Sequence, residues 1–365
     1  MQKNSSKFPV EFVDDAFGDS PVLADVLKKA TGSEKPKVLI VADLNVVQRT
    51  DGLGSKIGRY VQAHGIALAG NPIVLVGGEK AKADNLQSAL RLVSAALSAK
   101  LGRDDVILAI GGGTILDLAG YAAAQARGGV KIVRMPTTPA AMFGAAFADY
   151  AAVDSATVKD ALRVPSVPAA VVIDFSFAKT VLDGVWRGGL AEAVRQAVAC
   201  DAKFARRIFA CAEAYRDRDF ATLGELVRQS VAVREKKGST TFALWSALRL
   251  ESMSGYKLPH GYAIAIGVTI DVDYAAAAGL VKPEVRDEVV GCLRTCGALD
   301  GMGHSNHLIN QFDNLMLGLD AWALTAGTAE VTLPTGLGRT KGGHVPDREI
   351  LKGVLKKIVS VPAKA

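Results

Sequence analysis

The chain has 365 residues, of which 49% are hydrophobic and 22% are charged. This composition excludes a disordered chain, and the length favours two lobes, each with a sizeable core. The formal net charge is +6, but Lys and Arg are scattered among Asp and Glu and form no long basic run with aromatic residues. The charge therefore favours a small anionic ligand over a nucleic acid.

The start of the chain, MQKNSSKFPVEF, lacks the apolar region of a signal peptide. No uncharged segment approaches the length of about 18 residues that a membrane-spanning helix needs. We therefore expect a cytoplasmic protein without a membrane partner. Its four cysteines are too few for a disulfide framework in a chain of this length and are expected to be free thiols.

The first half of the sequence alternates β-rich segments with helical ones. The β-rich segments are nearly continuous in Val, Ile and Leu and predict buried strands at 37–43, 72–78, 106–113, 131–138 and 169–175. Residues 85–101 and 116–127 have helical periodicity. This alternation predicts a Rossmann-like α/β domain with a parallel sheet over residues 1–178.

The second half has a different pattern, with few strand signals after about Val181. Residues 190–215, 222–237 and 260–280 all have helical spacing. We expect an all-helical C-terminal domain over residues 179–365.

A glycine-rich turn, Gly111 to Gly113, lies between a predicted strand and a predicted helix. Glycine there lets backbone N–H groups approach a phosphate, and the start of the helix adds a favourable dipole. The spacing is not that of the dinucleotide-binding fingerprint, and a tight turn also favours glycine without a ligand. Taken alone, the turn leaves both interpretations open.

Polar side chains also follow the first two long predicted strands: Asp43 and Asn45 after the first, and Glu79 and Lys82 after the second. Each by itself could be a solvated loop residue. Ligands of open α/β sheets collect at successive strand ends, so the repetition predicts a dinucleotide site. A carboxylate at Asp43 can accept hydrogen bonds from a ribose and would repel a 2′-phosphate, which favours NAD over NADP.

Several segments together resemble the dehydroquinate synthase family, the sugar phosphate cyclases. In chain order they are VADLN, GGEKAK, GGGTILDLAGYAAA, RGGVKIVRMPTT, GGLAEAVRQAV and LPHGYAIAIG. The resemblance implies an NAD-binding α/β domain, a helical domain, an active site in the cleft between them, and a homodimer. It also implies a reaction in which NAD transiently oxidises a substrate alcohol, phosphate leaves, the ketone is reduced again, and an aldol step closes a carbocycle.

In this family a zinc ion held by one glutamate and two histidines polarises the oxygen that is oxidised. The resemblance makes Glu192 the glutamate ligand and His260 the second histidine. It places Arg127 and Lys159 around the substrate. The cofactor-side residues that match are Asp43, Asn45, Glu79, Lys82, Gly111, Gly112, Gly113, Asp117, Thr137 and Thr138.

The chain departs from the family where two histidines are expected four residues apart, because Leu244 and Leu248 occupy these positions. The first histidine would be the third zinc ligand, and leucine has no lone pair to donate. The metal site is reduced to Glu192 and His260, and its zinc occupancy is in doubt. We interpret the apolar character of this helix as the consequence of no longer facing a metal.

Other departures remove or alter charged groups in the expected pocket. Gly144 and Tyr262 stand where acidic residues are expected, and Tyr150 and Arg195 stand where lysines are expected. The connection at 234–242 is also shorter than usual in the family. We keep Tyr150 and Arg195 as candidate catalytic residues, together with His260, Glu192, Lys159 and Arg127.

Three hypotheses follow. The first is a divergent, NAD-dependent carbon–oxygen lyase or cyclase, with little or no zinc, acting on a small anionic, polyhydroxylated substrate; His260 would be a general base oriented by Glu192. The second is a non-catalytic NAD-binding or partner-binding protein, in which His260 could simply bond to backbone at a helix start. The third is a metal-dependent alcohol dehydrogenase of related fold, which would need more metal-binding histidines in the helical lobe.

Overall fold

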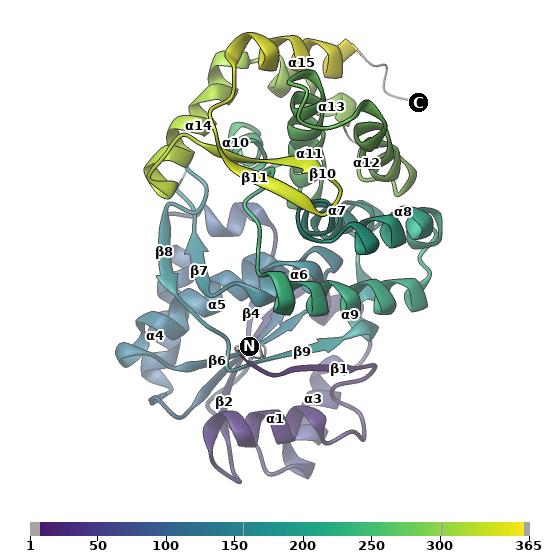
Figure 1. Cartoon of the computed structure of the whole chain (residues 1–365). Coiled ribbons are helices and arrows are strands. Elements are labelled where there is room, and N and C mark those ends of the chain that lie inside the picture. The colour runs from purple at the N-terminus through teal and green to yellow at the C-terminus, as the bar shows by residue number, and fades with distance from the viewer. Residues whose placement is uncertain (1–7, 156, 301, 361–365) are drawn as a thin grey trace, which may run out of the picture. The chain divides into compact units, whose positions relative to one another are not determined.

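The computed structural model describes residues 8–155, 157–300 and 302–360. Contacts between residues divide the described chain into two units. An α/β unit contains the residues up to 155 together with 160–182, and a helical unit contains 157–159 and the residues from 183 onward. Figure 1 shows the strands of the large sheet in the first unit and the long helices in the second.

The α/β unit is built on a seven-stranded sheet in which all paired strands are parallel. Its strands run in the order β1-β9-β6-β5-β2-β3, with β4 also paired to β2. Their bounds are β1 Val10–Val13, β2 Lys37–Asp43, β3 Ala67–Leu68, β4 Ile73–Leu75, β5 Val106–Gly111, β6 Lys131–Pro136 and β9 Ala170–Asp174. The five strands predicted from apolar runs are confirmed, and β1 and β3 are additional short strands.

Helices cover the sheet and explain its apolar strands. Alternate residues of β2 and β5, such as Val38 and Leu108, join the core formed with α1 (Val22–Thr31) and α3 (Leu53–Ala63). The helices α4 (Gln87–Ser98) and α5 (Gly113–Gln125) confirm the two predicted helical segments. Because β5 is buried along its whole length, polar alternation is absent from its sequence.

A small antiparallel hairpin, which the sequence analysis did not predict, follows the sheet edge where β6 ends. After the short helix α6 (Pro139–Phe143), β7 (Tyr150–Val153) pairs with β8 (Leu162–Pro165). Arg134 of β6 holds both ends of this hairpin, because its buried guanidinium donates to the backbone oxygens of Ala148, before β7, at 2.6 Å and of Ser166, after β8, at 2.7 Å.

The helical unit confirms the change of pattern after Val181, with one correction. It contains α7 Asp183–Cys200, α8 Ala202–Arg216, α9 Phe220–Lys237, α10 Leu244–Met253, α11 His260–Ala277, α12 Pro283–Thr295, α13 Met302–Ile309, α14 Phe312–Ala326 and α15 Arg348–Ser360. It also contains an antiparallel hairpin of β10 (Val331–Gly336) and β11 (Arg339–His344), so this part of the chain is mostly rather than entirely helical. Short strands with a bulged register carry little periodic signal.

The centre of the helical unit is formed by α7 and α11, which are buried along most of their lengths. Near the start of α11 the two backbones approach very closely: a Cβ atom on Gly261 would lie 2.4 Å from the carbonyl of Gly188. Only glycine allows this approach. Glu192 follows Gly188 by one helical turn and His260 precedes Gly261, so the crossing brings the two predicted ligands into one region.

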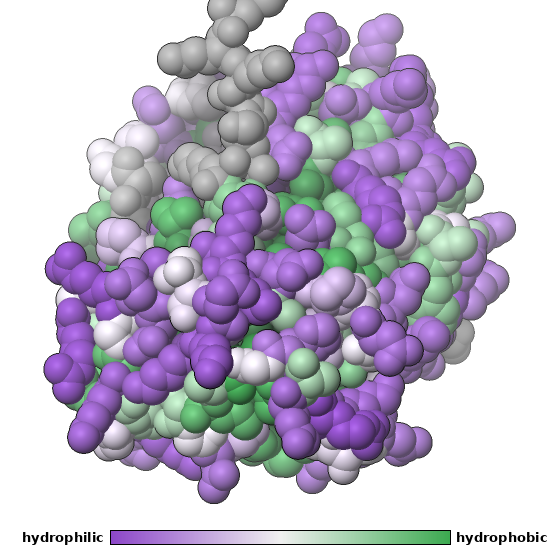
Figure 2. Space-filling model, turned by 90° about the horizontal axis from the view of Figure 1, so that it is seen from below, coloured by the Kyte–Doolittle hydropathy of each residue, from purple (hydrophilic) through white to green (hydrophobic). Residues whose placement is uncertain are grey.

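Within the described ranges, no helix combines the length and the apolar character that a membrane span requires. Figure 2 shows hydrophilic side chains over most of the visible face, with smaller apolar areas between them.

Candidate active site

The predicted cofactor residues meet at the carboxyl edge of the parallel sheet. In the strand register, Asp43 at the end of β2 is paired with Leu75 of β4, and Gly111 at the end of β5 is paired with Pro136 of β6. The strand order changes direction beside β2, because β3 and β4 lie on one side of it and β5 lies on the other. Such a switch point is where open α/β sheets bind their ligands.

The two carboxylate oxygens of Asp43 have different surroundings at this edge. It caps α2 (Leu44–Arg49) because its Oδ1 accepts a hydrogen bond from the backbone N–H of Asn45 at 2.8 Å. Burial raises the pKa of Asp43, against the opposing effect of the Asn45 hydrogen bonds. The other oxygen, Oδ2, lies against Gly77, where a Cβ atom would be only 2.0 Å away. Gly77 was not identified as a site residue, although it lies near the end of the predicted strand 72–78, which pairs with the strand of Asp43.

The glycine turn has a structural reason as well as a ligand-binding one. A Cβ atom on Gly111 would lie 2.6 Å from the side chain of Ile115, so packing alone requires glycine there. Gly112 is the N-cap of α5, and no described side chain caps that helix start. The hydroxyl of Thr137 is buried without a hydrogen-bond partner in the described chain, whereas Thr138 caps α6 through Ala141. An uncapped helix start beside an unpaired buried hydroxyl fits a bound pyrophosphate.

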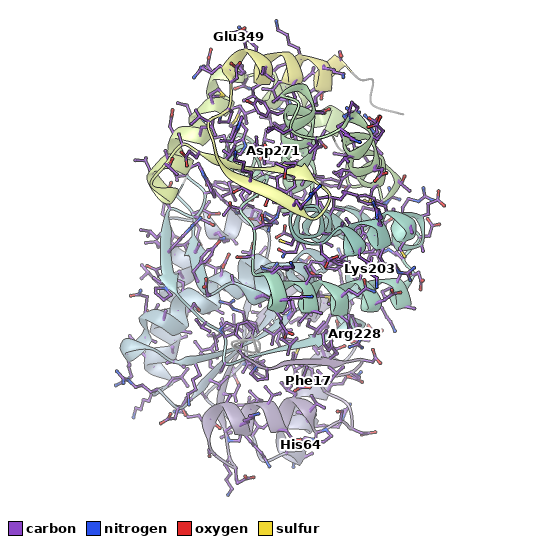
Figure 3. All side chains as sticks on the ribbon, viewed as in Figure 1. Phe17, His64, Lys203, Arg228, Asp271 and Glu349 are labelled. Atoms are coloured by element: carbon purple, nitrogen blue, oxygen red, sulfur yellow. The ribbon has the colours of Figure 1, made fainter. Side chains whose placement is uncertain are left out.

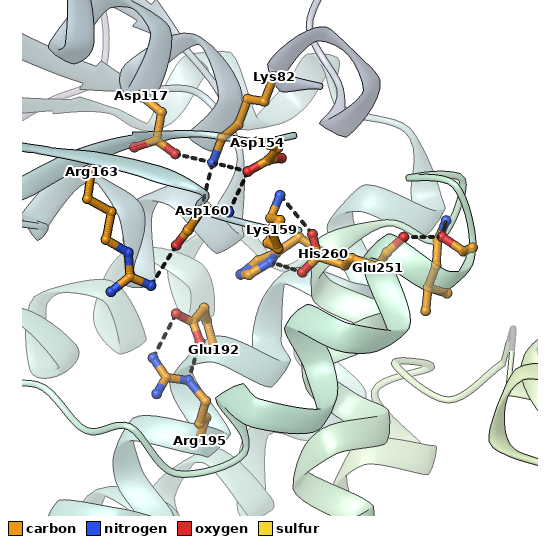
Figure 4. Close-up of polar contacts among 12 residues, drawn as sticks. Lys82, Asp117, Asp154, Lys159, Asp160, Arg163, Glu192, Arg195, Glu251 and His260 are labelled. Carbon is orange, nitrogen blue, oxygen red and sulfur yellow. Dashed lines mark hydrogen bonds and ion pairs between the residues drawn. The ribbon is translucent and has the colours of Figure 1, made fainter. Parts of the chain in front are cut away.

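Lys82 and Asp117, which the sequence analysis placed in separate segments, meet in one buried charge cluster (Figure 4). Lys82 Nζ lies 2.6 Å from Asp117, 3.4 Å from Asp160 and 3.8 Å from Asp154. The Lys82 side chain is 5% exposed, so three carboxylates surround one enclosed ammonium group. Asp154 and Asp160 were missed because they lie far along the chain and match no motif. Glu79 is half-buried at the beginning of the short helix that contains Lys82.

Two further candidate residues of the α/β unit, Tyr150 and Arg127, lie outside the charge cluster around Lys82. Tyr150 begins β7, and its ring packs under the Arg163 guanidinium at 4.8 Å from the ring centroid. Burial raises the pKa of Tyr150, and the charge of Asp160 adds to this rise. Arg127 is exposed beyond the last turn of α5, at the end of that helix opposite the glycine turn.

In the helical unit, Glu192 is engaged by Arg195, one turn further along α7 (Figure 4). Arg195 Nε donates to Oε2 of Glu192 at 2.6 Å, and Nη2 donates to Oε1 at 3.0 Å. Both side chains are nearly enclosed. Burial alone would raise the pKa of Glu192, but the charge and hydrogen bonds of Arg195, with contributions from His260 and Arg234, lower it to about 2.

His260 belongs to a second cluster, centred on Glu251 of α10. His260 Nδ1 lies 2.7 Å from Glu251 Oε1, and Lys159 Nζ lies 3.0 Å from Glu251 Oε2. The Glu251 side chain is fully enclosed, with 0% exposure. Lys159 belongs to the helical unit by its contacts, and it also lies 5.7 Å above the ring of Tyr256. The structure therefore brings His260 and Lys159 together through the carboxylate of Glu251.

These residues do not fit a bound zinc ion. Both oxygens of Glu192 accept hydrogen bonds from Arg195, so this carboxylate is already occupied by a guanidinium group. Leu244, the first residue of α10, is half-buried and offers no donor atom. Among the described residues, no group of three His, Cys, Asp or Glu side chains is placed to hold a metal ion.

Comparison with known proteins establishes the family to which this chain belongs. A family model described as the N-terminal part of 3-dehydroquinate synthase matches residues 72–187. The 2-epi-valiolone synthase of Actinosynnema mirum is 30% identical over 279 residues, which cover 72% of each chain. The chain belongs to the dehydroquinate synthase family.

Further comparisons agree with this assignment. The 3-dehydroquinate synthase of Helicobacter pylori is 27% identical over 330 residues, covering 88% of this chain and 92% of that protein. Among solved structures, a 2-epi-5-epi-valiolone synthase from Streptomyces hygroscopicus, described with NAD+ and Zn2+ bound, matches with a TM-score of 0.84 at 21% identity and covers 97% of both chains. At this identity the structural likeness establishes the fold.

Proposed function

We propose that this member of the dehydroquinate synthase family is an NAD-dependent enzyme of the sugar phosphate cyclase type. The observation that carries the proposal is the cluster of Lys159, Glu251 and His260. A fully enclosed carboxylate is costly unless its partners are in place. Here it orients an imidazole and holds an ammonium group, which is an arrangement suited to proton transfer.

The carboxyl edge of the α/β sheet supplies a site that suits NAD. The N-terminus of α5 offers backbone N–H groups to the pyrophosphate, and the Thr137 hydroxyl supplies a further polar partner. Asp43 Oδ2, held against Gly77, would accept hydrogen bonds from the adenosine ribose. A carboxylate in this place disfavours a 2′-phosphate, so NAD is preferred to NADP.

Bound NAD would supply the hydride acceptor that oxidises a substrate alcohol. The residues of this chain supply the proton chemistry. With Glu251 accepting at Nδ1, the neutral imidazole of His260 keeps its proton on that nitrogen, so the basic lone pair is on Nε2. His260 is then the base that takes the alcohol proton, Glu251 stabilises the resulting imidazolium, and Lys159 balances the charge of Glu251.

The substrate class is a small, anionic, polyhydroxylated compound. A 2-deoxy-scyllo-inosose synthase with the same fold has been described in complex with carbaglucose-6-phosphate, NAD+ and Co2+. In this chain Tyr150 and Tyr262 replace charged groups expected from the family pattern. We therefore infer a carbon–oxygen lyase or cyclase reaction on a substrate other than the usual heptulosonate phosphate.

The alternative is a non-catalytic NAD-binding protein on the same scaffold. It is favoured by the joint change at Leu244, Tyr150 and Tyr262, because a protein released from catalysis would lose ligand-binding and charged side chains together. This alternative predicts NAD binding without hydride transfer, so one experiment separates it from an enzyme.

The test begins with calorimetric titration of the purified protein with NAD and with NADP. Sugar phosphates are then screened for reduction of bound NAD, followed by absorbance and by mass change of the substrate. An enzyme reduces NAD with at least one compound, and His260→Asn abolishes this while leaving NAD affinity unchanged. Binding without reduction across the panel supports the alternative, and equal affinity for both dinucleotides contradicts the role of Asp43.

A further inference from the structure

We propose that Arg195 is an internal cation in the place of a metal ion on Glu192, and that it closes this site to divalent metals. The position expected to carry a lysine carries an arginine, whose planar fork can match both oxygens of a carboxylate. The loss of a histidine at position 244 removes a ligand. Arg195 has a second effect, because it binds the carboxylate of Glu192, a metal ligand that the chain has kept.

Arg195 and Glu192 form a pair with two parallel hydrogen bonds. Arg195 donates through Nε and Nη2 to the two oxygens of Glu192, at 2.6 Å and 3.0 Å. The side chains are 5% and 8% exposed, so little solvent can compete with this pairing. A metal ion would have to displace the guanidinium or share a carboxylate with it at close range, where like charges repel strongly.

The guanidinium of Arg195 is also anchored to the backbone. Its third nitrogen, Nη1, donates to the backbone oxygen of Thr240 at 2.6 Å and lies 3.4 Å from that of Phe242. These carbonyl groups belong to the segment directly before Leu244, the first residue of α10. Arg195 thus bridges Glu192 and the beginning of the helix that would present the third metal ligand.

Other positively charged groups also surround Glu192. Arg234 of α9 and His260 of α11 also act on this carboxylate, in addition to Arg195. Two guanidinium groups therefore act on one enclosed carboxylate. A divalent cation brought to this region would add charge to surroundings that are already positive, at an enclosed site where such repulsion is weakly screened.

The role of Arg195 also has a consequence for the proposed reaction, and this part rests on the proposed function. In a metal-dependent relative the bound ion supplies positive charge near the oxygen that is oxidised. Here a positive charge is built into α7 next to Glu192. The chain would need no metal for this electrostatic contribution, and chelators would leave its activity unchanged.

The experiment measures metal binding directly and is independent of turnover. Co2+ is titrated into the full-length protein and into Leu244→His, Arg195→Met and Leu244→His/Arg195→Met, and the visible absorption of bound Co2+ is recorded. Equilibrium dialysis with Zn2+ gives the stoichiometry. We expect no stoichiometric site in the unmodified protein or in either single variant. We expect one site in the double variant, with affinity at least about tenfold above that of Leu244→His, in the range by which groups next to a metal ligand change affinity.

A matched control is offered by Arg187, on the same helix, which forms a half-exposed pair with Asp300 at 2.8 Å. The variant Leu244→His/Arg187→Met loses an arginine from α7 but keeps the Glu192–Arg195 pair, so it should bind no more metal than Leu244→His alone. Leu244→His/Arg195→Gln provides a second form of the test in case the methionine variant does not fold.

Three results would overturn the assignment. The first is stoichiometric zinc in the unmodified protein. The second is tight metal binding by Leu244→His with Arg195 in place, which does not depend on the folding of any double variant. The third is a folded double variant, shown by circular dichroism, that binds no metal. NAD affinity is measured in the same proteins, and its loss would count against the proposed function and not against the role of Arg195.

Discussion

Removal of Arg195 should destabilise the helical unit far more than removal of a similar arginine at its surface. The chain offers a close comparison. Arg207 of α8 donates to Glu225 of α9 through the same two nitrogens, Nε at 2.7 Å and Nη2 at 2.6 Å. The side chains of Arg207 and Glu225 are 46% and 39% exposed, whereas those of Arg195 and Glu192 are 5% and 8% exposed. The two pairs therefore share the same two nitrogen donors, and they differ in burial and in the further hydrogen bond that Arg195 Nη1 donates to Thr240.

The expected magnitude follows from what each substitution leaves behind. Arg195→Met leaves the Glu192 carboxylate enclosed without its partner, and breaking a buried pair in this way costs about 3–5 kcal/mol. The pKa of Glu192 agrees in direction, because the charge and hydrogen bonds of Arg195 lower it against the opposing effect of burial. Arg207→Met leaves a carboxylate in water, so the urea midpoint should hardly move.

Urea unfolding followed by tryptophan fluorescence reports on the correct part of the chain. The three tryptophans, Trp186, Trp245 and Trp322, all belong to the helical unit. The double variant Arg195→Met/Glu192→Gln removes the orphaned charge and should recover part of the lost stability. Together with the single variants Arg195→Met and Glu192→Gln it gives the coupling free energy of the pair. Equal losses for Arg195→Met and Arg207→Met, or no recovery in the double variant, would refute the reasoning.

Three further outcomes are expected. Burial raises the pKa of Asp271 to about 7, although Trp245 and Ala243 donate hydrogen bonds to it (Figure 3 labels Asp271 in the helical unit). Since this folded-state pKa lies above the ordinary value of 3.8, the unfolded chain releases the proton first, and stability should fall as pH rises from about 4 to 7. Asp271→Asn should flatten that part of a stability profile measured by urea unfolding; an unchanged slope would contradict it. Arg134→Lys should destabilise the α/β unit by about 2–4 kcal/mol, measured by far-ultraviolet circular dichroism, because one ammonium group cannot serve the separate carbonyls that the guanidinium bonds; a loss below about 1 kcal/mol would be too small for that role. Gly77→Ala should weaken NAD binding at least about tenfold in calorimetry, because the new methyl group displaces the Asp43 carboxylate; unchanged affinity would remove Asp43 from the site.

Local sequence determined the elements whose periodicity is regular. The apolar runs at β2, β5, β6 and β9 predicted buried parallel strands, because a strand covered on both faces has no polar alternation. The helical spacing of α7, α9 and α11 was equally readable, and strand ends with Gly, Asp or Thr predicted the edge where a dinucleotide would bind. The order of the family motifs then sufficed for the fold and for the expectation that a metal ligand is missing at Leu244.

Only the tertiary structure decided which side chains meet. The hairpins β7–β8 and β10–β11 are short and depend on partner strands more than on periodicity. Two ion pairs, Lys159 with Glu251 and Lys82 with Asp160, join segments that lie far apart in the chain. Such contacts arise when helices and strands pack, and no spacing within one segment encodes them. The Glu192–Arg195 pair is the reverse case: its spacing along one helix was visible in the sequence, but its burial, which gives it its strength, was not.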